Sequence, residues 1–129
     1  MSKLTLKLIG ENFSIHSLAV NSKIPKEIFS APIYFIAKTY DEISIVLPSH
    51  YLLTSDNVEP DWQALEVIGP LDFSLTGILS NISAVLASEK ISIFAMSTFD
   101  TDYILVKRNT VEAAVAALRL NHYQVITEQ

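Results

Sequence analysis

The residues best suited to chemistry lie in one short polar stretch, STFDTD, in the second half of the sequence. Two carboxylates, Asp100 and Asp102, stand on either side of one threonine. Carboxylates at this spacing can hold an ammonium or guanidinium group through charge-assisted hydrogen bonds. Ser97, Thr98 and Phe99 can add a hydroxyl, a backbone group and an apolar wall. A structural role stays open, because aspartate is an ordinary turn former and Phe99 can equally end a strand inside the core.

A second candidate group surrounds the predicted start of a helix, at Gly77. A residue without a Cβ lets a ligand approach the amides of the first helical turn, and the positive helix end favours a carboxylate. The alternative is a glycine needed for tight packing of the helix on a sheet. The other candidate ligand-binding residues here are Asp72, Ser74, Thr76 and Ile78. Ser74 or Thr76 can also cap the helix, since a side-chain oxygen accepts from an unpaired first-turn amide.

Catalytic and metal-binding readings find little support. The histidines His16, His50 and His122 have no partner at helical spacing and no HExxH motif, so we expect no metal site and no cofactor. The GxSxG, P-loop and GxGxxG motifs are also missing from the sequence. Two solvated turn carboxylates would serve acid–base chemistry poorly. We therefore expect no enzyme activity, with a small enzyme on the same fold as the least favoured alternative.

Composition narrows the class of partner. The 129 residues fit one domain or two very small ones, and half of them are hydrophobic. Without cysteine, the chain has no disulfides and no thiolate zinc site. A net charge of −5 with scattered Lys and Arg argues against nucleic acid and anionic membrane as partners. The first residues alternate apolar and polar, and no apolar run reaches roughly 20 residues, so we expect a cytoplasmic protein without a signal peptide.

The second half has the periodicity of four strands and two helices. We predict strands at 62–69, 91–96, 103–106 and 122–127, and helices at 75–88 and 110–121. The stretch STFDTD is the turn between the second and third of these strands. Asn109 and Glu112 have the spacing of a capping box at the start of the second helix. The order β-α-β-β-α-β predicts an α+β, ferredoxin-like fold with both helices on one face of the sheet.

The first half is less regular. Leu4, Leu6 and Leu8 alternate with polar residues, and the letters GEN at 10–12 predict a hairpin turn into a strand at 13–18. A short helix follows at 24–29, with Pro25 in its first turn, and then strands at 33–39 and 43–47.

An internal repeat connects the two halves. Residues 33–48 line up with 91–107, and Thr39-Tyr40-Asp41 falls on Thr98-Phe99-Asp100 at an offset of 59, with one residue skipped afterwards. A repeat predicts two pseudo-symmetric units, residues 1–60 with reduced helical content and residues 61–129. In that case the first-half turn faces a second or a degenerate site. Two hairpins rich in isoleucine and valine can also look alike by composition alone.

The second half resembles the ACT-domain family. The letters GPLDFSLTGILSNISAVLASEKISIFAMSTFDTDYILVK at 69–107 follow the family pattern of a loop with a glycine at the helix start, an Ile/Leu-rich helix, and a strand that enters a hairpin. They are similar to a subgroup found as tandem copies in small bacterial proteins and in cytosolic arginine sensors, where LTGIL and STFDTDYILV are the recurrent features. The chain departs from the family at Thr76, where a proline usually precedes the helix glycine.

The resemblance implies a non-catalytic, allosteric regulatory module that binds an amino acid at an interface between two such folds. Tandem copies would form that pair within one chain. It also implies that the hairpin acid meets the basic end of the ligand. The alternative is a homodimeric protein-interaction module without a ligand.

Overall fold

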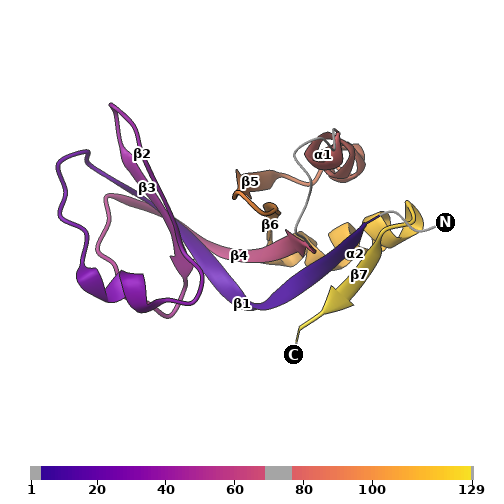
Figure 1. Ribbon diagram of the computed structural model, residues 1–129, viewed down its shortest axis with the longest axis horizontal. Coiled ribbons are helices and arrows are strands. Elements are labelled where there is room, and N and C mark those ends of the chain that lie inside the picture. Colours follow the sequence, from indigo (N-terminus) through magenta and orange to yellow (C-terminus); the bar gives the residue numbers. More distant parts are fainter. Residues whose placement is uncertain (1–3, 69–76, 129) are drawn as a thin grey trace. The chain divides into compact units, whose positions relative to one another are not determined.

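The computed structural model describes residues 4–68 and 77–128 (Figure 1). Its elements are β1 (Thr5–Leu18), η1 (Lys26–Ser30), β2 (Phe35–Lys38), β3 (Ile43–Pro48), β4 (Asn57–Val67), α1 (Ile78–Ser88), β5 (Ile93–Ser97), β6 (Asp102–Lys107), η2 (Arg108–Thr110), α2 (Val111–Leu120) and β7 (Gln124–Thr127). The chain divides into two compact units, an insert unit of residues 11–62 and a main unit formed by residues 1–10 and 63–129. The strands β1 and β4 each run through both units.

The main unit has the predicted ferredoxin-like order of elements, β4-α1-β5-β6-α2-β7, and one additional strand. Its strands lie in the order β7-β1-β4-β6-β5, so the first part of β1 separates β7 from β4. The pairing of β1 with β7 is parallel and runs from Thr5 opposite Gln124 to Leu8 opposite Thr127.

Both helices of the main unit lie on one face of its sheet, as the apolar stripes predicted. A single core joins them to alternate residues of the strands, and its members include Leu65 and Val67 of β4, Ile104 and Val106 of β6, Ile82 and Leu86 of α1, and Val111, Ala114 and Leu118 of α2. Successive strand side chains point to opposite faces, so the residues between these core positions lie on the face away from the helices. Among the described residues, no helix is long and apolar enough to cross a membrane.

The insert unit repeats the strand order with fewer helical residues. Its strands lie in the order β4-β1-β3-β2, and the only helical element described within it is η1, a five-residue 3₁₀ helix. The sequence predicted this element slightly earlier, at 24–29, whereas Pro25 precedes it at the N-cap. The core of the insert unit consists of Leu18, Ile28, Ala31, Ile43, Ile45 and Leu47.

The two hairpins have the same register. Phe35 pairs with Val46 and Lys38 with Ile43 in the insert unit, and adding 59 to each number gives the pairs found between β5 and β6 in the main unit. The two hairpins therefore match in their strand pairing, and the skipped residue of the sequence alignment was wrong. One constant shift serves both strands, because neither hairpin contains a bulge between the paired positions.

The predicted hairpin turn at 10–12 is also wrong, because β1 continues through these residues. The amide of Gly10 donates to the carboxylate of Glu128 at 3.0 Å. A Cβ on Gly10 would stand 3.3 Å from the backbone oxygen of Glu128, which is a tight contact. This glycine therefore permits a close approach of the C-terminal segment and does not make a turn.

Other helix and strand ends also differ from those predicted, among them the starts of α2 and β4. Thr110, not Asn109, is the N-cap of α2, and its hydroxyl donates to the carbonyl of Lys107 at 2.8 Å, so the predicted capping box with Glu112 does not form. A turn of 3₁₀ helix, η2, leads directly into α2 and takes the place of that box. The strand predicted at 62–69 is β4, which starts earlier, at Asn57.

Candidate functional site

The turn between β5 and β6 is held by the hydroxyl of Thr98. This oxygen accepts from the amides of Asp100 at 3.2 Å and Thr101 at 3.1 Å, and the amide of Thr98 donates to the carbonyl of Thr101 at 2.7 Å. A threonine that binds the amides ahead of it favours a tight turn. The hydroxyl and the amide of Thr98 are therefore both occupied in shaping the turn.

The first-half turn is built in the same way. The hydroxyl of Thr39 accepts from the amides of Asp41 at 3.1 Å and Glu42 at 3.2 Å, and the amide of Thr39 donates to the carbonyl of Glu42 at 2.9 Å. The Thr-aromatic-Asp match in the sequence thus reflects one turn geometry used twice.

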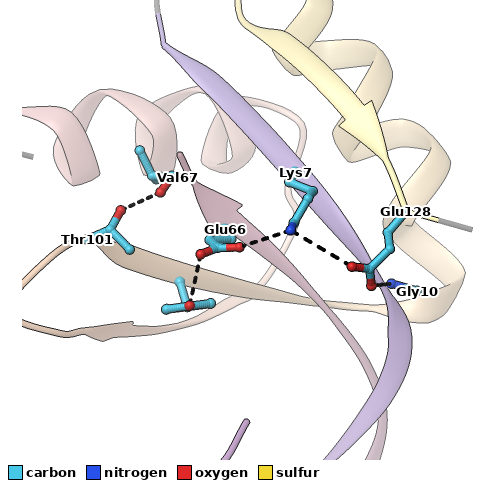
Figure 2. Close-up of polar contacts among 7 residues, drawn as sticks. Lys7, Gly10, Glu66, Val67, Thr101 and Glu128 are labelled. Carbon is cyan, nitrogen blue, oxygen red and sulfur yellow. Dashed lines mark hydrogen bonds and ion pairs between the residues drawn. The ribbon is translucent and has the colours of Figure 1, made fainter. Parts of the chain in front are cut away.

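A buried hydroxyl ties the main-unit turn to the end of β4. The side chain of Thr101 is 8% exposed and donates to the carbonyl of Val67 (Figure 2). Residue 67 ends β4, and the connection to α1 starts directly after it. The contact therefore places the STFDTD turn beside the end of β4.

The two carboxylates of the turn have different surroundings. Asp102 is partly buried and accepts a hydrogen bond from Ser97, its cross-strand partner. Asp100 is exposed, and in the described parts of the chain its carboxylate has no hydrogen bond or ion pair. Phe99 is 80% exposed, so it is not a core residue. One carboxylate and one aromatic ring are thus accessible at the tip of the hairpin.

Gly77 stands at the N-cap of α1 with a φ of 76°, in the left-handed region that glycine adopts at little cost. Among the described residues, a Cβ on Gly77 would meet only the side-chain amide nitrogen of Asn81, at 3.6 Å. The positive φ favours a glycine here, and the space beside it is open among the described residues. Ile78 follows as the first residue of α1 and is partly buried against the core.

Three candidates, Asp72, Ser74 and Thr76, lie outside the described residues, and so does the first part of the helix predicted at 75–88. The α1 helix starts at Ile78 without a side-chain cap from its N-cap residue, Gly77. In the described ranges, no three His, Asp or Glu side chains form a group that could hold a metal ion.

A polar network on the face away from the helices was missed by sequence reasoning. The ammonium of Lys7 lies 3.7 Å from the carboxylate of Glu66 and 3.8 Å from that of Glu128 (Figure 2). The hydroxyl of Tyr103 donates to Glu66 at 3.0 Å. Burial, the hydrogen bond to Glu66, and the charges of Glu66 and Asp100 raise the pKa of Tyr103 to about 12. The available signal for this network was one charged residue between two apolar neighbours in each strand, Lys7 in β1 and Glu66 in β4.

The hairpin and the helix start belong to a segment that matches a family model. Residues 57–119 match the model of the ACT domain. This chain contains an ACT domain. The match begins at the first residue of β4 and ends within α2, so it includes Gly77 and the whole STFDTD turn.

Other proteins share parts of this sequence and fold. Subunit 1 of the cytosolic arginine sensor for mTORC1 from Mus musculus is 34% identical over 101 residues, which cover 77% of this chain and 30% of the sensor. The chain thus spans about a third of that relative. A crystal structure of an Agobacterium tumefaciens protein is 29% identical, with a TM-score of 0.91, and covers 100% of this chain and 96% of that one.

A third structure shares the fold alone. The ligand-free regulatory subunit of aspartate kinase from Thermus thermophilus is 11% identical, with a TM-score of 0.65 over 89% of this chain and 95% of that one.

Proposed function

We propose that this ACT-domain chain is a non-catalytic regulatory module that binds an amino acid. The observation that supports the proposal most directly is the start of α1 at Gly77, which has open space beside it among the described residues and no side-chain cap from its N-cap residue. First-turn amides carry partial positive charge and lack partners within the helix, so they suit an α-carboxylate. The glycine leaves room for that group to approach.

The STFDTD turn supplies the opposite pole. Asp100 offers an accessible carboxylate, and Asp102 adds a second one that is shared with Ser97. An ammonium or a basic side chain would be held there by charge-assisted hydrogen bonds. We expect Ile78 to lie on the carboxylate side of the proposed site, and Thr98 and Phe99 on its hairpin side. Asp72, Ser74 and Thr76, which lie outside the described residues, stay candidates for the carboxylate side. This combination of positive and negative poles matches a zwitterion.

The relatives agree with a sensing role. The mouse relative is named as a cytosolic arginine sensor, and the Thermus structure is the regulatory subunit of an enzyme. We therefore place this chain in the cytoplasm and expect it to act on another protein, or on a second copy of itself, through different affinities of the ligand for two arrangements.

Isothermal titration of the chain against the twenty amino acids tests the proposal. We expect heat with at least one of them, and we expect Asp100→Asn and Asp102→Asn each to weaken that binding about ten- to hundredfold, as for a lost charged hydrogen bond. Gly77→Ala should also weaken it, because the added methyl group occupies the carboxylate's space. Asp56→Asn, an exposed change in the insert unit, is the matched control and should keep wild-type affinity.

Two outcomes would contradict the proposal. The lack of heat with all twenty amino acids would favour a protein-interaction module without a ligand. Unchanged affinity in a folded Gly77→Ala variant would move the carboxylate site away from the start of α1.

A further inference from the structure

The insert unit has a hollow beside its own Thr-aromatic-Asp turn. The residues that line this insert hollow are Val20, Lys38, Thr39 and Tyr40. Val20 follows the end of β1, and the other three lead from β2 into the turn. With the constant shift of 59 between the hairpins, Lys38, Thr39 and Tyr40 correspond to residues 97–99 of the main unit. Those residues form part of the proposed amino-acid site.

The shortened helix gives a physical reason for the hollow. In the main unit the eleven-residue α1 follows β4, whereas in the insert unit the five-residue η1 follows β1. At about 1.5 Å per residue for an α-helix and about 2 Å for a 3₁₀ helix, η1 covers roughly two-thirds of the length that α1 covers. Only Ile28 of η1 is buried. The end of the insert hairpin is therefore less covered by helix than its counterpart.

The charge at the mouth of the hairpin is reversed between the two units. The last cross-strand pair before the turn is Ser97 with Asp102 in the main unit and Lys38 with Ile43 in the insert unit. A carboxylate in one unit is thus replaced by an apolar side chain, and a hydroxyl by an ammonium. Among the described residues, no carboxylate lies within ion-pair distance of Lys38.

Two acidic residues, Asp41 and Glu42, follow Lys38 in the insert turn. Glu42 accepts a hydrogen bond from the hydroxyl of Ser17 at 2.9 Å, on β1. Asp41 is exposed, and neither it nor Glu42 lines the hollow. Tyr40 lines it and is 100% exposed, so the face of its ring is available to a flat ligand.

We infer that the insert hollow is a second ligand site and that it takes a small carboxylate with an aromatic or apolar body. The ammonium of Lys38 binds the carboxylate, the ring of Tyr40 stacks on the body of the ligand, and Val20 adds apolar contact. One exposed ion pair and one stacked ring support an affinity on the order of 1 mM. This site differs from the proposed amino-acid site in selecting an anion and rejecting a cation.

Phenylacetate is a suitable probe, and phenethylamine is a cation of similar size. Amide chemical shifts of the ¹⁵N-labelled chain would be followed during titration with each. We expect phenylacetate to shift the amides of Val20, Lys38, Thr39 and Tyr40 in a saturable way, and phenethylamine to leave them in place. Equal shifts with both probes, or no saturable shift with phenylacetate at concentrations well above about 1 mM, would overturn the inference.

Two matched variants separate the charge from other effects. Lys38→Met keeps an apolar stem and removes the ammonium, so the affinity for phenylacetate should fall by up to about fivefold, as for one lost exposed ion pair. Lys26→Met removes an exposed charge from η1, outside the hollow, and should leave the affinity unchanged. The amide spectrum of each variant reports whether it is folded. Equal affinity of folded Lys38→Met and wild type would show that the ammonium does not select the ligand.

The same variants distinguish this site from the proposed amino-acid site. Lys38→Met should leave amino-acid binding unchanged, and Asp102→Asn should leave phenylacetate binding unchanged. Phenylacetate shifts confined to the STFDTD turn and the start of α1 would assign the anion to the main unit and would refute the second site.

Discussion

Replacing Thr101 with valine tests how firmly the STFDTD turn is held to β4. The two side chains have the same shape, so Thr101→Val removes the hydroxyl that donates to the carbonyl of Val67 and changes the volume little. Thr101 is 8% exposed and Val67 is fully buried, so the carbonyl would lose this donor where water has little access. Such a loss costs about 1–3 kcal/mol of unfolding free energy. The backbone bonds between Thr98 and Thr101 survive the change, because they do not use the removed hydroxyl.

Urea unfolding would measure this cost, and Thr101→Ser is the matched control. Serine keeps the donor and loses one methyl group, so it should cost about 0.8 kcal/mol at most. We expect a lower midpoint for the valine variant with an unchanged slope, and faster amide exchange in the turn. A valine variant within about 0.5 kcal/mol of wild type, or a serine variant destabilised equally, would refute the role of the hydroxyl.

Three further predictions concern titration and packing. Burial lowers the pKa of His16 below 6.5, so the unfolded chain binds this proton more readily than the folded one. The free energy of unfolding should therefore fall as the pH drops below about 6.5. Urea midpoints measured across this range should depend less on pH in His16→Gln than in wild type. The pKa of Tyr103 is raised to about 12, so its contribution to stability should be lost as the pH rises from about 10 through 12, and Glu66→Gln should lower this pKa in an absorbance titration of the phenolate. Leu86→Ala should cost about 2–5 kcal/mol in urea unfolding, because Leu86 is fully buried, whereas Leu79→Ala, at a partly buried position, should cost less; equal losses would show that α1 packs differently.

The elements of the second half could be predicted because their signals are local. Apolar residues at helical spacing predicted both α1 and α2. The turn between β5 and β6 depends on hydrogen bonds between Thr98 and residues that are two and three positions away. The same local rule in the first half made the repeat visible before any strand pairing was known.

Features that depend on distant partners could not be predicted. Gly10 has the neighbours of a turn glycine, but its partner, Glu128, is 118 positions away. Lys38 looked like one of many scattered lysines, and only the strand register shows that its pair with Ile43 corresponds to the pair of Ser97 with Asp102. The start of α2 was misplaced for a different reason, since several residues near 109 can cap a helix and the backbone selects among them.

The parallel pairing of β1 with β7 has a consequence for the order of folding. Thr5 and Gln124, which meet in this pairing, are separated by 119 positions, whereas the partners of the β2–β3 hairpin are near neighbours in the chain. Closing a loop costs entropy that grows with its length, and contacts of high sequence separation form slowly. During synthesis the insert unit can therefore assemble while the ribosome is still adding residues, but the first part of β1 must wait for β7. We expect nascent chains that end before Gln124 to leave one edge of β1 without its parallel neighbour. That unpaired edge can then associate with other chains until synthesis is complete.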